Sequence, residues 1–385
     1  MSHDAPDGGG RAAGDWSPWL DHRLGAIRSE GRWREPRDFD AWGPRGTLTA
    51  TGAQVVSFAS NDYLGLTTHP TVVAAAHEAL DRWGTGSGGS RLITGARPVH
   101  RALEEELAAW KGTERAVLFP TGFAANLGVL GALGDRGVRI VSDERNHASI
   151  IDGARLARAE VSVWRHGDLS GLEDLLAGSD SPTLVVTDTV FSMDGDTLDV
   201  AAVGDLCRRH RAVLVLDEAH AVLGPNPTAT DLAGVEVVRV GTLSKALGAL
   251  GGFAACSQRV ADLLVNVART AIFTTALSPA DAAAARSALD VVRSAEGERL
   301  RDRLRRHVHR LRPGHPSPIV AVILGDEETA VAASSALLDQ GLWVPAIRPP
   351  TVAPGTSRLR ITVSAGHSDA DVDHLVGALA ATGAS

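Results

Sequence analysis

Short apolar runs alternate with longer mixed segments through the middle of the chain. Each run has the length of a buried strand, and the segment after it has the alanine and leucine content of a helix. The runs lie at residues 116–119, 138–141, 161–164, 183–187, 212–216 and 237–240. Strands that alternate with helices form a mostly parallel sheet that is covered by helices on both faces. The pattern therefore predicts an α/β domain.

The segments on either side of this region follow other patterns. Residues 16–37 read as a helix with arginines on one side, and residues 47–50 and 54–58 read as a hairpin. Residues 71–83 read as a further helix. Beyond residue 279 we expect an arginine-rich helical stretch, a strand, a helix, a strand and a final helix, at residues 280–312, 319–324, 329–340, 358–363 and 368–380.

These patterns divide the chain into four predicted parts. Residues 1–15 are polar and glycine-rich without an apolar core, which is typical of a disordered tail. Residues 16–56 form an N-terminal helix and hairpin segment. The strand and helix repeats form a large domain at residues 57–279, and residues 280–385 form a smaller α+β domain.

Composition narrows the classes of function. The 385 residues carry a net charge of -8 with a pI of about 6.0, which argues against a nucleic-acid-binding surface. The two cysteines, Cys207 and Cys256, are too few for a disulfide framework and lack metal-site spacing. No apolar run reaches membrane-spanning length. We therefore expect a cytoplasmic protein without nucleic-acid or membrane partners.

Polar clusters follow the predicted strands where each strand ends. In mostly parallel sheets, ligands bind outside the carboxyl ends of the strands. The residues at these ends include His147, Ser192, Asp217, His220 and Lys245. We expect their side chains to converge at one edge of the sheet.

Lys245 is conspicuous because the chain has only one other lysine, Lys111. All other lysine-or-arginine positions are arginine. A guanidinium group stays charged, whereas an amine can lose its proton and form a Schiff base. Lys245 lies among small residues after the strand at residues 237–240. We predict that Lys245 is a catalytic amine and that Lys111 is an ordinary surface lysine.

Three other kinds of site were weighed. Gly84, Gly86 and Gly89 match a dinucleotide-binding pattern, but the segment before them reads as a helix and the fingerprint requires a strand. The Asp-Glu-Ala-His run at residues 217–220 suggests an ATPase box, but neither lysine stands in a phosphate loop. No local spacing supports a metal site, so none is expected.

Pyridoxal phosphate accounts best for the remaining groups. Its aldehyde needs an amine, which Lys245 offers, and its pyridinium nitrogen needs a fixed carboxylate, which Asp217 offers. Its phosphate needs hydroxyl and N–H groups near a helix start, and residues 121–123 and Thr242 are placed for this. His147 can stack on its ring. We therefore expect pyridoxal 5'-phosphate as the cofactor.

With these groups assembled, the chain resembles the α-oxoamine synthases, a branch of the fold-type I pyridoxal-phosphate enzymes, from about Trp19 to the C-terminus. The blocks that carry the resemblance are residues 60–65, 86–91, 146–149, 190–196, 217–220 and 242–248. It implies a fold-type I architecture, with a mostly parallel seven-stranded sheet in the large domain and a smaller α+β C-terminal domain. Residues 347–352 and 355–360 are most similar to the branch that condenses alanine with a pimeloyl thioester in biotin synthesis.

The resemblance implies a role for each residue around the cofactor ring. Lys245 would bond the cofactor aldehyde and then remove the Cα proton of the amino acid. Asp217 would pair with the pyridine nitrogen, and His220 with the phenolic oxygen. His147 would stack on the ring, and Ser192 would lie near the phenolic oxygen.

The resemblance also implies residues for the phosphate. Gly122, Phe123 and Thr242 would hold the phosphate side. They would be joined by Thr274 or Thr275 from a second subunit, so the family predicts a homodimer.

The substrates are assigned in the same way. Arg360 would bind the carboxylate of the amino acid, which a guanidinium group does through two hydrogen bonds. Asn61 and Arg28 would lie near the substrates.

One segment departs from the family. After residue 220 the family continues with a glycine-rich stretch, whereas residues 221–230 here are shorter and contain prolines. The acyl donor is therefore open, and three hypotheses follow. The chain is the alanine–pimeloyl enzyme, a sibling that joins glycine or serine to another acyl-CoA, or a protein that binds the cofactor without catalysis. The full set of catalytic residues argues against the third.

Overall fold

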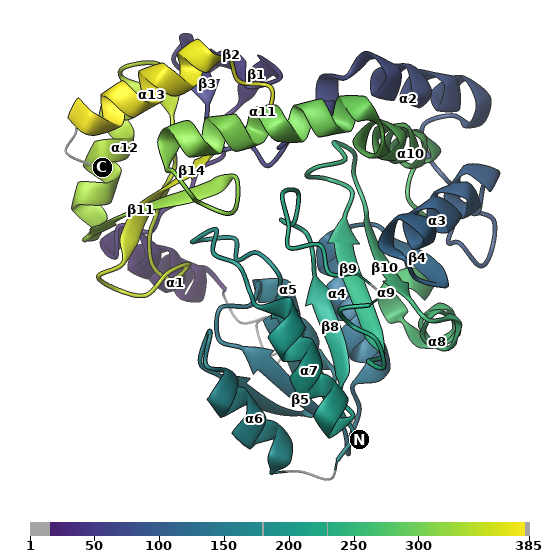
Figure 1. The fold of residues 1–385 in the computed structure, drawn as a ribbon. Coiled ribbons are helices and arrows are strands. Elements are labelled where there is room, and N and C mark those ends of the chain that lie inside the picture. Colours follow the sequence, from purple (N-terminus) through teal and green to yellow (C-terminus); the bar gives the residue numbers. More distant parts are fainter. Residues whose placement is uncertain (1–15, 179–180, 229, 382–385) are drawn as a thin grey trace, which may run out of the picture.

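The computed structural model describes residues 16–178, 181–228 and 230–381 (Figure 1). The predicted N-terminal tail, residues 1–15, lies outside the described residues. Figure 1 shows a large sheet with its helices and, beside it, a smaller group of strands and helices, with α11 (Ala295–Leu311) running across both. None of the helices within the described ranges is long and apolar enough to cross a membrane.

The large sheet has seven strands in the order β4-β10-β9-β8-β7-β5-β6. Their bounds are β4 (Arg115–Phe119), β5 (Arg139–Asp143), β6 (Glu160–Trp164), β7 (Thr183–Asp188), β8 (Val213–Asp217), β9 (Val237–Thr242) and β10 (Gly252–Cys256). Only β10 runs antiparallel to its neighbours, β4 and β9. The predicted mostly parallel, seven-stranded α/β sheet is confirmed.

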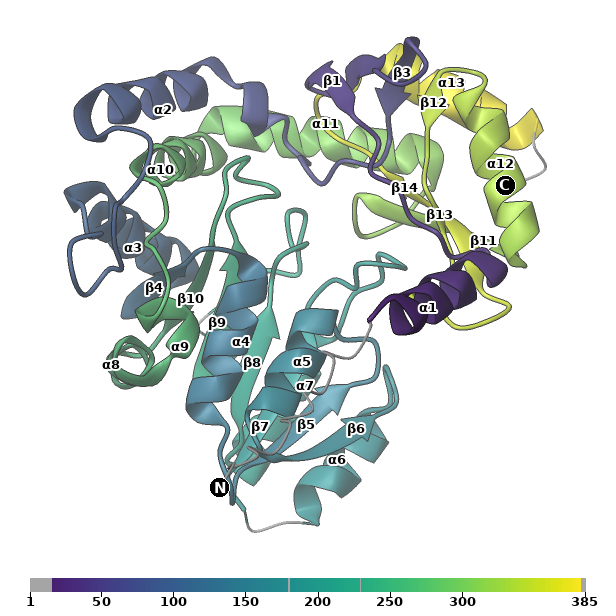
Figure 2. The ribbon, with the colours of Figure 1, turned by 180° about the vertical axis from the view of Figure 1, so that it is seen from behind.

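Helices cover both faces of this sheet (Figures 1 and 2). On one face α4 (Gly122–Leu133), α5 (Ala148–Leu156) and α8 (Gln258–Val267) bury a core that includes Val215. On the other face α6 (Leu169–Ala177) and α7 (Val200–His210) bury Leu214 and Leu216. Neighbouring residues of β8 therefore point to opposite faces, as the strand period of two requires.

The smaller part contains two short sheets. One has the order β11-β14-β13, with β11 (Ile319–Gly325), β13 (Ala346–Ile347) and β14 (Ser357–Thr362), all antiparallel. The other has the order β1-β2-β3-β12, with β1 (Phe39–Trp42), β2 (Arg45–Leu48), β3 (Ala53–Ser57) and β12 (Leu342–Trp343). The predicted hairpin is confirmed as β2 and β3. Because β3 pairs with β12, the N-terminal hairpin lies with the C-terminal part of the chain.

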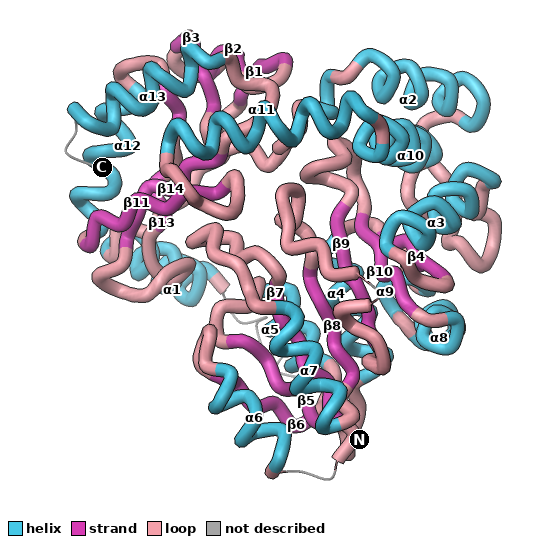
Figure 3. Tube along the Cα trace, in the orientation of Figure 1, coloured by secondary structure: helices cyan, strands magenta, loops and turns pink. Residues whose placement is uncertain are grey.

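The remaining helices lie around these sheets (Figure 3). Their bounds are α1 (Ser17–Ser29), η1 (Leu66–Thr68), α2 (Pro70–Trp83), α3 (Pro98–Lys111), α9 (Arg269–Ile272), α10 (Pro279–Arg293), α12 (Glu327–Leu338) and α13 (Asp369–Ala381). Figure 3 shows loops gathered beyond the ends of β8 and β9, between the large sheet and the smaller part. This is the edge at which the sequence predicts the functional residues.

Several elements differ from the sequence prediction, which named no helix at α3 or α8. The first helix ends at Ser29, so the rest of the predicted helix at residues 16–37 is not helical. The predicted stretch at residues 280–312 is two helices, because Ser294 interrupts it and caps α11 by accepting from the N–H groups of Glu296 and Gly297. Strand β10 was not predicted, since its small residues read as part of a glycine-rich loop.

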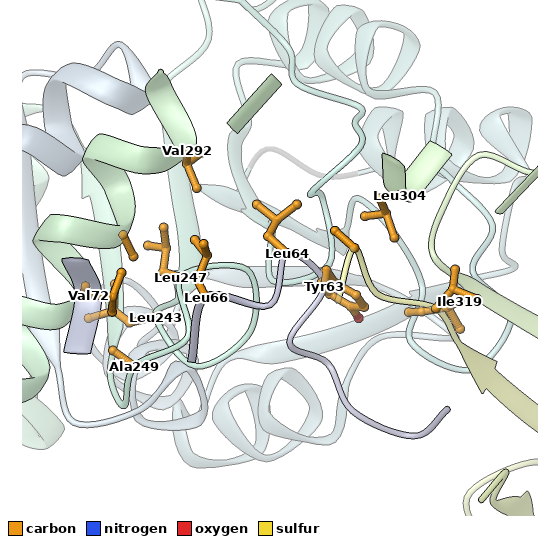
Figure 4. Close-up of a cluster of buried hydrophobic side chains, with 14 of the residues drawn as sticks. Tyr63, Leu64, Leu66, Val72, Leu243, Leu247, Ala249, Val292, Leu304 and Ile319 are labelled. Atoms are coloured by element: carbon orange, nitrogen blue, oxygen red, sulfur yellow. The ribbon is translucent and has the colours of Figure 1, made fainter. Parts of the chain in front are cut away.

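The loop after β3 is buried among apolar side chains from both parts of the chain (Figure 4). Figure 4 shows Tyr63 and Leu64 of this loop in one cluster with Leu243 and Leu247, which flank Lys245. All four side chains are at most 2% exposed. This burial fixes the backbone on both sides of the lysine.

Candidate active site

Two acidic residues at the end of β8 point to opposite faces of the sheet. Asp217 points to the α4 face, where its Oδ2 accepts a hydrogen bond from Asn126 Nδ2 at 2.7 Å. Its Oδ1 accepts from the N–H of Ala219 at 2.9 Å. Asp217 is buried, so these two donors hold its carboxylate in a fixed orientation.

Glu218 points to the α3 face and forms a buried ion cluster with Lys111 and Arg239. Its carboxylate lies 2.7 Å from Lys111 Nζ and 2.7 Å from Arg239 Nη2. Burial alone would raise the pKa of Glu218, but these two cations lower it. The prediction that Lys111 is a surface lysine was wrong: it is 8% exposed. It ends a helix, which is a solvent-facing position in most sequences, and only the fold brings Glu218 to it.

His147 is held at the start of α5. Its backbone N–H donates to Asp188 Oδ2 at 2.9 Å, and its ring Nδ1 lies 2.7 Å from Ser149 Oγ. Burial lowers the pKa of His147, which keeps the ring neutral. Burial and the charge of Asp217 raise the pKa of Asp188 well above its ordinary value. The sequence analysis missed Asp188, although this residue directly follows the predicted strand at residues 183–187.

Lys245 stands in the turn after β9. Its Nζ lies 2.9 Å from His220 Nε2, and burial lowers its pKa, against the opposing charges of Asp217 and Asp188. A lowered pKa favours the neutral amine, which is the nucleophilic form. The structure thus brings together Lys245, His220, Asp217 and His147, as the sequence analysis expected.

A chain of hydrogen bonds continues from His220 to Arg360. His220 Nδ1 lies 2.5 Å from the hydroxyl of Tyr63, and that hydroxyl lies 3.2 Å from Asn61 Oδ1. Arg360 Nη2 donates to the same Asn61 oxygen at 3.2 Å. The sequence analysis proposed Asn61 and Arg360 as substrate residues but assigned no role to Tyr63. A single tyrosine next to a predicted site residue was the available signal.

Arg360 is a buried cation without a carboxylate partner in the described part of the chain. Its Nε donates to the carbonyl oxygen of Ser192 at 2.5 Å, and its Nη1 donates to Thr362 Oγ1 at 3.0 Å. A buried guanidinium group is costly unless a negative charge pairs with it. Arg360 therefore has the environment of a residue that receives an anionic ligand. The structure shows Ser192 contacting Arg360 through its backbone.

The loop that carries Ser192 is held by charges from both parts of the chain. His166 Nδ1 lies 3.0 Å from Asp143 Oδ2, and its Nε2 lies 2.6 Å from Asp196 Oδ2. Asp194 pairs with Arg358 of β14. These ion pairs fix the loop against the smaller part of the chain.

The His166 cluster should make stability depend on pH. Hydrogen bonds to Asp143, then Asp196, raise the pKa of His166 from 6.5 to about 9. The contribution of protonated His166 to the free energy of unfolding is then complete below pH 6.5 and is lost as the pH rises through about 9. His166→Gln should lower the free energy of unfolding by about 1.5–3 kcal/mol near pH 6. Urea unfolding should show this loss shrinking near pH 10; an equal loss at both pH values contradicts the assignment.

The candidate phosphate residues lie where α4 begins beside the end of β9. The side chain of Thr121 caps α4 by accepting from the N–H of Ala124 at 3.0 Å, so the N–H groups of Gly122 and Phe123 have no acceptor within the helix. A Cβ atom added to Gly122 would lie 3.2 Å from Cβ of Thr242. Glycine therefore allows the start of α4 to pack closely against Thr242, and the helix start favours an anion nearby.

Three predicted site residues lie apart from this group within the described chain. Thr274 is half-buried and Thr275 is exposed, next to Phe273, whose side chain is 71% exposed. The guanidinium group of Arg28 lies over the ring of Trp33, 4.1 Å from its centroid. Their predicted roles involve a second subunit or a bound substrate.

Comparisons with known proteins show which proteins this chain resembles. The sequence model described as "Aminotransferase class I and II" matches residues 53–379. An 8-amino-7-oxononanoate synthase from Trichlorobacter lovleyi is 44% identical over 382 residues, which cover 94% of this chain and 97% of that protein.

Two solved structures extend the comparison. A serine palmitoyltransferase from S. paucimobilis, solved with a bound compound of PLP and myriocin, has a TM-score of 0.87 and 30% identity, and the match covers 96% of this chain and 97% of that one. An 8-amino-7-oxononanoate synthase from Francisella tularensis has a TM-score of 0.71 and 25% identity, with 85% and 96% covered. The likeness therefore covers most of this chain.

Proposed function

We propose a function from the premise that this chain belongs to the aminotransferase class I and II family, which the matched range and the relatives show. The chain is a pyridoxal-phosphate-dependent acyltransferase that condenses L-alanine with a pimeloyl thioester, losing carbon dioxide, to form 8-amino-7-oxononanoate in biotin synthesis. The observation that carries this proposal is Arg360, a buried cation without a carboxylate partner in the described chain, joined by hydrogen bonds to the group around Lys245.

The residues present fit pyridoxal phosphate. Lys245 offers an amine whose pKa burial lowers, and Asp217 offers an oriented carboxylate for the pyridine nitrogen. Gly122 brings the start of α4 close to Thr242, so that the N–H groups of the helix start and the Thr242 hydroxyl would hold the phosphate. His147 is the ring-stacking residue. When bound, the cofactor supplies an electron sink for the electron pair left when a bond at the substrate Cα breaks.

The protein's own residues bind the amino acid and move its proton. Arg360 and Asn61 bind the alanine carboxylate, which sets which Cα bond is oriented for cleavage. Lys245 takes the Cα proton, because its lowered pKa favours the neutral amine, which is the basic form. His220 holds a hydrogen bond at Lys245 and, in our proposal, at the cofactor's phenolic oxygen, with Ser192 nearby.

The acyl donor is tested by comparing thioesters. We expect kcat/KM with alanine and pimeloyl-CoA to exceed, by at least about tenfold, that with acyl-CoAs of equal length lacking the distal carboxylate, since hydrogen bonds to charged groups give about 1.5–3 kcal/mol. Arg28 is the proposed contact for that carboxylate. Product masses with alanine, glycine and serine identify the amino acid. If plain acyl chains react equally well, or serine replaces alanine, the sibling function takes its place.

The active form is proposed to be a homodimer in the cytoplasm. Exposed apolar side chains support a subunit interface. Phe273, beside Thr274, is 71% exposed, and Ile93 and Leu92, in the loop between α2 and α3, are 79% and 55% exposed. The two cysteines are free and buried, which suits a reducing compartment.

The dimer has its own test. Sedimentation should give twice the mass of the chain, and Thr274→Val with Thr275→Val should weaken cofactor binding without changing that mass. A monomer that remains fully active on dilution would contradict the proposed contribution of a second subunit to the site.

A further inference from the structure

The hydroxyl of Tyr63 lies at the centre of the chain of hydrogen bonds between the lysine and the carboxylate-binding arginine. It has two possible acceptors for its proton, His220 Nδ1 at 2.5 Å and Asn61 Oδ1 at 3.2 Å, and the guanidinium group of Arg360 also hydrogen-bonds to it. A phenol has one proton to donate. Which neighbour receives it decides how the protons are arranged on the histidine.

The distances favour His220 as the acceptor. A phenol donates its proton preferentially to the nearer and better-placed acceptor. Nδ1 of His220 lies nearer to the hydroxyl, at 2.5 Å, than Asn61 Oδ1 does, at 3.2 Å, which favours Nδ1 as the acceptor of the Tyr63 proton. Asn61 Oδ1 already accepts from Arg360 at 3.2 Å, so it does not depend on Tyr63.

Both groups are held in the protonation states that this arrangement needs. Tyr63 is fully buried, and burial raises its pKa, so the phenol keeps its proton. Burial, with the charges of Lys245 and Arg360, lowers the pKa of His220 well below its ordinary value, so the imidazole is neutral. A neutral imidazole has one N–H and one bare nitrogen. If Nδ1 accepts from Tyr63, the proton is on Nε2.

We propose that Tyr63 is a positioning residue that fixes the proton of His220 on Nε2, so that His220 is a hydrogen-bond donor at Lys245. Nε2 lies 2.9 Å from Lys245 Nζ. The amine then accepts and keeps its neutral form. With the opposite tautomer, Nε2 would carry no proton. It would then accept a hydrogen bond from Lys245 and stabilise the charged ammonium form of the lysine.

The proposal rests on the proposed function for the meaning of its kinetic effects, but its direct test does not. The chain contains two lysines and one tyrosine. Amine-selective acetylation of the protein without cofactor, read by mass spectrometry over a range of pH, therefore reports Lys245, with Lys111 in its ion pair as the internal reference. Tyr63→Phe removes the hydroxyl and keeps the ring that packs in the core.

In Tyr63→Phe we expect acetylation of Lys245 relative to Lys111 to fall by about threefold near pH 8, because the apparent pKa of Lys245 rises and less of the amine is neutral. The kcat for the condensation should fall about tenfold with the alanine KM changed less than about twofold, since Arg360 still binds the carboxylate. A folded variant with unchanged Lys245 acetylation overturns the proposal, whatever acyl donor the enzyme uses.

A conservative replacement provides the matched variant. Because the chain has one tyrosine, biosynthetic 3-fluorotyrosine alters Tyr63 alone and makes its phenol a stronger donor. Acetylation of Lys245 should then be unchanged or increased, and kcat should stay within about twofold of the unlabelled protein. If Tyr63→Phe fails to fold, the protein with 3-fluorotyrosine provides the test. Decreased acetylation of Lys245 contradicts the proposed direction of donation, and unchanged or increased acetylation supports it.

Discussion

Replacing Asp217 with asparagine should slow removal of the alanine Cα proton by at least about tenfold. The amide keeps the shape of the side chain and its place beside Asn126, but it removes the charge proposed to pair with the pyridine nitrogen. A hydrogen bond to a charged group contributes about 1.5–3 kcal/mol, and 1.4 kcal/mol is a factor of ten in rate. Exchange of the Cα proton of alanine for deuterium, followed by mass spectrometry, measures this step alone.

The matched control for Asp217 is its neighbour on the other face of the sheet. Glu218→Gln removes a carboxylate from the ion cluster with Lys111 and Arg239. It should lower the free energy of unfolding by more than it raises the activation free energy of alanine exchange. If alanine exchange in Asp217→Asn stays at the wild-type rate, Asp217 is not the partner of the cofactor nitrogen.

Replacing Arg360 with alanine should lower kcat/KM for alanine by about 30- to 4,000-fold, since truncating one partner of a buried charge pair costs about 2–5 kcal/mol. The alanine KM should rise steeply. The kcat should fall as well, because the carboxylate orients the Cα bond that breaks. Arg360→Lys should rescue little, since an ammonium group cannot form the two parallel hydrogen bonds of a guanidinium group.

Arg358 is the control for this prediction, since it is a buried arginine two residues away on β14. It pairs with Asp194, whereas Arg360 has no carboxylate partner in the described chain. Arg358→Ala should therefore lower stability and raise the alanine KM less than Arg360→Ala does. Equal effects of the two substitutions on the alanine KM would contradict the assignment of Arg360.

The periodic pattern of the chain predicted the large sheet because its strands are continuous apolar runs with helices between them. The same reasoning missed β10, since residues 252–256 follow a glycine-rich loop and are small apart from Phe253. A Cβ atom at Gly252 would lie 2.4 Å from the backbone of Thr121, so the close approach of β10 to the start of α4 requires a residue that looks like a loop residue. Packing between distant segments, rather than local pattern, determines this strand.

The candidate site was predictable to the extent that its residues end strands. Asp217 ends β8 and Lys245 lies in the turn after β9, and these parallel strands end at the same edge. Tyr63 comes from a loop that the fold brings to His220 over 157 positions of sequence, and no local pattern predicts that contact. The buried setting of Lys111 depends on the fold in the same way.

The central claim is that Lys245 bears the cofactor, and borohydride reduction tests it most directly. Because the chain has only two lysines, digestion of the reduced protein and mass spectrometry can distinguish them without ambiguity. The account predicts that the reduced cofactor is covalently fixed to the peptide containing Lys245, and that Lys111, held by Glu218, is unmodified. Cofactor found on Lys111, or on neither lysine, would contradict it.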